Sequence, residues 1–228
     1  MKYTLLIVPY IQILLRIPYY LQNYDYKLLM FSHFITSIIN STFVAILLFF
    51  LLKNTKINNF LSILVFGTFS FYLNFLFTGT IGFPFHSIVL NQVHPTYLFT
   101  DKMQLPINIV PILPMISTLN NSLALLYLFY NLMLLAPATF TILYFGWIKN
   151  IKKILLLAFI SSIFIELIQL IEMVILSFYE IDELRAADIN DVILNFISGV
   201  IGIIVFKVYF KFSTKFKSDK TFLVFFRS

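Results

Sequence analysis

Long apolar stretches separated by short polar segments run along almost the whole chain. A helix needs about 20 apolar residues to cross the hydrocarbon core of a bilayer. The first stretch, 3–21, is interrupted by two prolines and an arginine, and we interpret it as a tilted span or an uncleaved signal-anchor. Four others meet the requirement well and a fifth nearly does; in chain order they are 28–52, 60–83, 123–147, 153–178 and 190–211. The pattern predicts an all-α polytopic membrane bundle of about six transmembrane helices.

Composition strengthens this interpretation and excludes several functions. The 228 residues are 60% hydrophobic and only 11% charged, whereas about a quarter of a soluble domain is charged. Lipid, rather than water, must therefore solvate most of the surface. Cysteine is absent, which excludes disulfide, zinc-finger and thiol chemistry. The three histidines lack metal-ligand spacing, so we expect no metal and no cofactor.

The distribution of charge predicts the orientation of the spans. Twelve of the 16 Lys and Arg residues fall on alternate loops and at the two ends of the chain. Because Lys and Arg accumulate on cytoplasmic segments, both termini should be cytoplasmic. The net charge of +6 then reflects topology and attraction to anionic lipid, and it does not indicate a nucleic-acid partner.

A long proline-rich segment, 84–122, should consequently face outward. Five prolines within it oppose a continuous helix. It is either a surface connector or a lid over a site, since loops of this length are often functional.

Polar residues recur on one side of the 153–178 span. At about 100° per residue, its small and polar side chains fall within roughly 80° of one another; they are Ala158, Ser162, Glu166, Gln169 and Met173. Ionisable groups at membrane depth tend to face protein or water and to be functional. The carboxylate of Glu166 is therefore a candidate acid or base.

The last span has a matching seam, formed by Asp188, Asp191, Asn195, Gly199 and Gly202. Carboxylates at its start suit the helix dipole, and Asp188 is equally a candidate N-cap. The glycines, with Ser162 on the other span, are candidates for close helix packing.

The two seams should face each other, because a short outer loop joins antiparallel spans. Counting inward from that loop places Asn195 level with Gln169, and Gly199 level with Glu166. Arg185, within the loop, could neutralise the nearby carboxylates and hold a phosphate or carboxylate group. The cluster is then either a binding or catalytic site or structural glue for a helix pair.

The order and spacing of these residues resemble the signature of the VanZ-like membrane proteins. The pattern runs from Glu166-x-x-Gln169 through Arg185, Asp188, Asp191 and Asn195 to the two glycines, Gly199 and Gly202. Asn108-Ile-Val-Pro111 resembles a second element of the family, and Asn108 is a further candidate for substrate binding. Asn131 to Thr139 resembles a third, in which Leu135 stands where phenylalanine is usual and Thr139 where glycine is usual. These departures put in doubt any role that needs a tight turn at Thr139.

The resemblance implies a bacterial cell membrane and a link to teicoplanin resistance, without a defined reaction. It divides the chain into a two-span N-terminal extension (1–56), a four-span VanZ-like core (57–213) and a basic aromatic cytoplasmic tail (214–228). The expected partners are membrane lipids and either a lipid-linked cell-wall precursor or a glycopeptide antibiotic. Three functions stay open: a factor that lowers antibiotic susceptibility, an enzyme in which Glu166 or Asp191 is the acid or base, and a non-catalytic scaffold.

Overall fold

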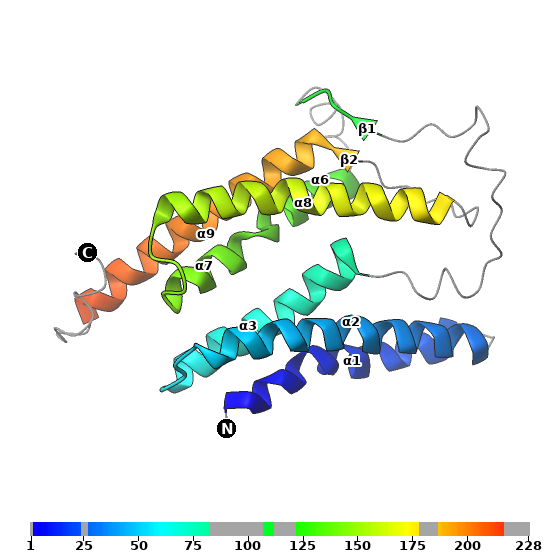
Figure 1. Cartoon of the computed structure of the whole chain (residues 1–228), viewed down its shortest axis with the longest axis horizontal. Helices are drawn as coiled ribbons and strands as arrows, with labels where there is room; N and C mark the ends of the chain where they lie inside the picture. Colours follow the sequence, from blue (N-terminus) through cyan, green and yellow to red (C-terminus); the bar gives the residue numbers. More distant parts are fainter. Residues whose placement is uncertain (1, 24–26, 83–106, 112–121, 178–186, 217–228) are drawn as a thin grey trace. The chain divides into compact units, whose positions relative to one another are not determined.

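A computed structural model describes residues 2–23, 27–82, 107–111, 122–177 and 187–216. Helices account for nearly all of these residues (Figure 1). Five helical segments are long and apolar enough to cross a membrane, namely Phe31–Lys53, Phe60–Thr80, Leu125–Tyr144, Ile151–Ile175 and Ile189–Ser213. The predicted all-α class and the five most apolar spans are confirmed. Most of the proline-rich 84–122 loop and the 217–228 tail lie outside the described residues.

The chain divides into two compact units, which are described separately. The first contains residues 1–109 and 164–189, and the second contains residues 110–163 and 190–228. This division differs from the domain boundaries that the resemblance implies, which stay a prediction.

Three helices make up most of the first unit. The 3-10 helix η1 (Lys2–Ile7) leads into α1 (Val8–Asn23), which is followed by α2 (Lys27–Lys53) and α3 (Phe60–Leu76). Figure 1 shows these three α-helices lying side by side. A π-helical turn, η2 (Phe77–Ile81), extends α3. The stretch predicted at 3–21 is thus helical, and whether it crosses the membrane stays a prediction.

Hydrogen bonds between buried amides fix α1 against α3. The side chain of Asn74 donates to Pro9 O at 2.9 Å and to Gln12 Oε1 at 2.8 Å, and Gln12 in turn donates to Phe71 O at 2.8 Å. Apolar packing gives little net attraction between helices in lipid, so such polar contacts contribute much of their specificity.

The second unit contains a broken helix. The stretch predicted as one span at 123–147 forms α6 (Ser122–Leu134) and α7 (Ala136–Tyr144), with a bend at Leu135. α9 (Ile189–Phe216) packs against α7 and against the first half of α8 (Ile151–Ser177). The core of this contact is Leu143, Ile154, Ile203 and Phe206.

A two-residue strand pair completes the described structure. β1 (Ile107–Asn108) pairs in parallel with β2 (Ala187–Asp188), which immediately precedes α9. The pairing joins a point within the proline-rich segment to the connection between α8 and α9.

Candidate functional site

Three of the predicted site residues meet in the first unit, around the carboxylate of Glu166. This side chain is only 7% exposed, and its Oε2 accepts a hydrogen bond from the backbone N–H of Asp188 at 3.1 Å. In the strand pair, Asn108 lies opposite Asp188. Hydrogen bonds to a charged acceptor are stronger than neutral ones, so Glu166 ties α8 to the segment that leads into α9.

A second polar contact lies in the second unit, at the start of α9. Asn131 on α6 donates through its side-chain Nδ2 to Asp191 Oδ1 at 2.5 Å. Asp191 occupies the first turn of α9, where the helix dipole favours negative charge. Sequence reasoning noted Asn131 only as part of a family element. The available signal was an asparagine within an apolar span, six residues before Pro137.

Asn195 lies one turn after Asp191 and on the same side of α9, because residues four apart share a face. Its side chain is 1% exposed. Within the described part of the chain, its Oδ1 accepts no hydrogen bond. A buried acceptor without a donor costs about 1–3 kcal/mol, so a donor supplied from elsewhere would stabilise this face of α9.

Ser198 explains how the broken span keeps its backbone satisfied. The ring of Pro137 removes one N–H and is incompatible with a continuous helix. The N–H groups of Leu135 and Ala136 both donate to Ser198 Oγ at 2.9 Å. Ser198 is fully buried, and bent backbone at membrane depth is tolerated where protein supplies partners. Sequence reasoning missed Ser198, although Pro137 signalled a break.

The glycines of α9 lie where neighbouring helices approach closely. A Cβ at Gly199 would lie 2.6 Å from Ala158 Cβ on α8. A Cβ at Gly202 would overlap the hydroxyl of Thr139 and the carbonyl oxygen of Ala136, both on α7. Neither position can take a side chain unless a neighbour moves.

Thr139, which stands where the family usually has glycine, lies within α7 rather than in a tight turn. Its hydroxyl donates to the carbonyl oxygen of Gly199 at 2.9 Å. The threonine therefore adds a hydrogen bond between α7 and α9.

The register expected between the last two spans is wrong. Gly199 contacts Ala158 and not Glu166, which lies two turns further along α8. Glu166 instead lies level with Asp188. The counting assumed that both helices end at the same height, whereas α8 continues well past the level at which α9 begins.

The other predicted candidates have less defined surroundings. Gln169 is half-buried on α8, one turn beyond Glu166. Ser162 is fully buried and donates to Ala158 O within its own helix at 2.8 Å. Arg185 lies outside the described residues. Within the described segments, no group of three or more histidine and acidic side chains is arranged to hold a metal ion.

A comparison with protein-family models identifies the chain. The model described as VanZ/LLP1 matches residues 69–210, which include every candidate above. The chain belongs to the VanZ/LLP1 family. Searches of curated proteins and of solved structures found no match. Together with its five apolar helices, family membership makes this VanZ/LLP1 protein a multi-pass membrane protein.

Proposed function

We propose that this VanZ/LLP1 protein lowers susceptibility to teicoplanin-type glycopeptides by binding a lipid-linked cell-wall precursor at the outer face of the cell membrane. The observation that carries the proposal is the polar face at the start of α9. There, Asp191 presents a carboxylate held by Asn131, and Asn195 presents a buried oxygen that accepts no hydrogen bond from the described residues.

The chemistry of this face favours a ligand rich in hydrogen-bond donors. Asp191 and Asn195 Oδ1 offer acceptors, so they suit hydroxyl, amide N–H or ammonium groups. The sugar and peptide parts of a wall precursor carry all three kinds of donor. On sequence grounds alone, Arg185, six residues before Asp191 in the chain, is the candidate for its phosphate, since guanidinium orients phosphate well. A precursor held in this way would be less available to an antibiotic that recognises the same headgroup.

A catalytic role is the second candidate, and the burial of Glu166 favours it. A carboxylate removed from water is a common general acid or base. If the protein is an enzyme, its expression should change the chemical composition of the precursor pool, whereas a binder should leave the composition unchanged.

The proposed site is at the outer face only if the topology inferred from charge is right. With both termini cytoplasmic, the 53–59 loop lies inside and the 84–122 loop lies outside. The chain has no native cysteine. A cysteine at Val110 should therefore react with an impermeant reagent on intact cells, and one at Asn54 should not; the reverse result would contradict the topology.

The functional test removes charge at nearly constant shape. Asp191→Asn, Glu166→Gln and Arg185→Gln are each expressed in a susceptible bacterium, and teicoplanin susceptibility is measured alongside the amount of protein in the membrane. Glu172→Gln, also on α8 but off the polar seam, is the matched control. The proposal expects lost protection at normal abundance for the first three variants only. If protection falls merely in proportion to abundance, the polar residues stabilise the packing of the helices and do not form a functional site.

A further inference from the structure

The turn between α7 and α8 lies at the end of the second unit that is far from Asp191, and hydrogen bonds fix its backbone. Gly146 adopts a φ of 65°, which favours glycine, and its N–H donates to Leu143 O at 3.1 Å. Asn150 then caps α8, because its Oδ1 accepts the backbone N–H of Lys152 at 2.9 Å and of Lys153 at 3.3 Å. The turn therefore holds the side chains that follow it in defined positions.

The last turns of α9 pack against this turn. Phe206 and Ile203 share a buried cluster with Leu143 and Ile154. The rings of Tyr144 and Tyr209 lie 5.8 Å apart. Lys207 and Lys211 lie on this same part of α9, one turn apart. Lys207 is about 24 Å along the helix from Asp191.

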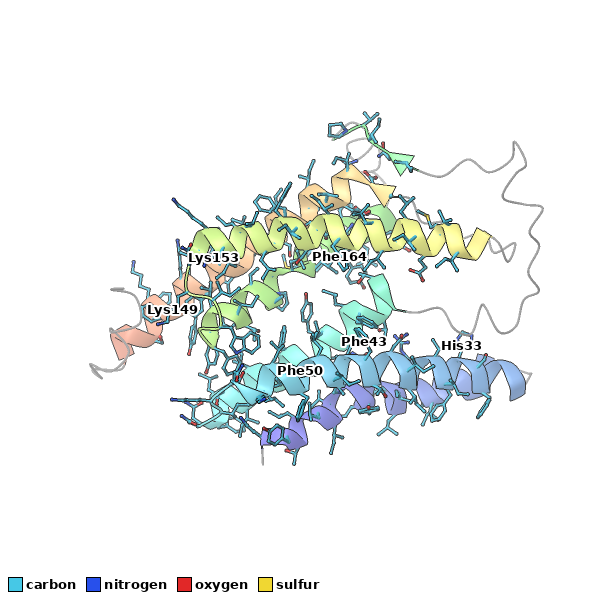
Figure 2. All side chains as sticks on the ribbon, viewed as in Figure 1. His33, Phe43, Phe50, Lys149, Lys153 and Phe164 are labelled. Atoms are coloured by element: carbon cyan, nitrogen blue, oxygen red, sulfur yellow. The ribbon has the colours of Figure 1, made fainter. Side chains whose placement is uncertain are left out.

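The result is an exposed basic rim, which we define as Lys149, Lys152, Lys153, Lys207 and Lys211. Figure 2 shows Lys153 at the start of α8 and Lys149 in the turn that precedes this helix. No Asp or Glu occurs in 136–165 or 192–216, so no acidic side chain of these segments offsets the charge. The N-terminus of α8 adds a partial positive charge.

The surface next to the basic rim is apolar. Exposed side chains on α8 and α9 continue from the lysines along the span, and they include Leu156, Phe159, Ile204, Val208 and Phe212. A ligand of this region must therefore match both the cationic rim and the adjacent apolar surface, which suits acyl chains.

We propose that the basic rim binds the phosphate headgroup of an anionic phospholipid, whose acyl chains lie along the adjacent faces of α8 and α9. Lysines at membrane ends extend toward the headgroups while their stems contact apolar surface. A free phosphate ion would gain only the charge contacts, whereas an anionic phospholipid gains both. This site is separate from the proposed precursor site and does not depend on it.

The test compares phosphatidylglycerol with phosphatidylcholine on the full-length protein, in detergent, by native mass spectrometry. Each lysine near an anionic surface contributes about 1 kcal/mol, or roughly fivefold in affinity. The variant Lys153→Gln/Lys207→Gln should therefore bind phosphatidylglycerol at least tenfold more weakly. Lys53→Gln/Lys56→Gln, which removes the same charge from the first unit, is the matched control.

Three results decide the proposal. Selective loss in the rim variant, with restoration by Lys153→Arg/Lys207→Arg, supports it. Equal binding by the rim variant and its control overturns it, as does displacement of the lipid by inorganic phosphate at millimolar concentration. On the wild-type protein, raising ammonium acetate from about 0.1 to 0.5 M should remove most of the preference for phosphatidylglycerol, because salt screens exposed charges. A preference that survives this change also overturns the proposal.

Discussion

Ser198→Ala tests the interpretation of the broken span. The substitution removes the shared acceptor of two backbone N–H groups, those of Leu135 and Ala136, each 2.9 Å from Ser198 Oγ. Ser198 is 0% exposed, so bulk water does not reach the two donors. Both donors would then be left without a partner.

The expected loss of stability follows from these two donors. A buried unsatisfied donor costs about 1–3 kcal/mol, while measured side-chain hydrogen bonds within membranes average about 0.6 and reach about 1.7 kcal/mol. Two bonds lost together should lower the free energy of unfolding by about 2 kcal/mol, a factor of roughly 30 in the equilibrium constant.

Ser162→Ala is the matched control for this measurement. Ser162 is also 0% exposed, but among the described residues its hydroxyl donates to Ala158 O in its own helix. Its loss should lower the free energy of unfolding by less than about 0.5 kcal/mol, because the carbonyl can keep its helical partner. Reversible unfolding in mixed micelles would measure both variants. Equal effects would refute the proposed capping of the break by Ser198.

Further predictions concern packing in both units. Gly199→Ala should destabilise by about 1–3 kcal/mol through overlap with Ala158 Cβ; adding Ala158→Gly should restore part of the loss, and strictly additive effects would contradict this contact. Gly67→Ala is the control, since its Cβ would lie 3.8 Å from the nearest atom and should be tolerated in thermal unfolding. Substituting Gln12 and Asn74 by alanine, singly and together, should give a coupling of about 0.5–1.7 kcal/mol in a double-mutant cycle; zero coupling would argue against the amide link between α1 and α3.

Hydropathy located the uninterrupted spans well, because lipid imposes length and apolarity directly on sequence. The stretches 28–52 and 153–178 correspond to α2 (Lys27–Lys53) and α8 (Ile151–Ser177). The break at Leu135 was not predicted, since the apolar run continues through it and only Pro137 signals a bend. Hydropathy reports that a segment is buried in lipid, and not how its backbone is paired.

Helical periodicity identified polar faces but not their partners. It placed Asp191, Asn195 and Gly199 on one side of α9, yet the donors to this side came from elsewhere in the chain. The error in the predicted register between α8 and α9 has the same origin. Ala158 lies beside Gly199 because of how far α8 extends, and the sequence defines the ends of helices poorly. Ser198 was overlooked because its acceptor role depends on a tertiary contact between α9 and the break at Leu135.

Direct binding of a lipid-linked wall precursor to the purified protein tests the central claim most directly. Asp191→Asn keeps an oxygen for the Asn131 amide but removes the charge, and Glu172→Gln is the matched control. Wild-type protein and the control should bind the precursor with equal affinity, and Asp191→Asn should bind at least tenfold more weakly, consistent with the loss of a hydrogen bond to a charged group. Absence of binding by the wild-type protein, or equal binding by Asp191→Asn, would contradict the account.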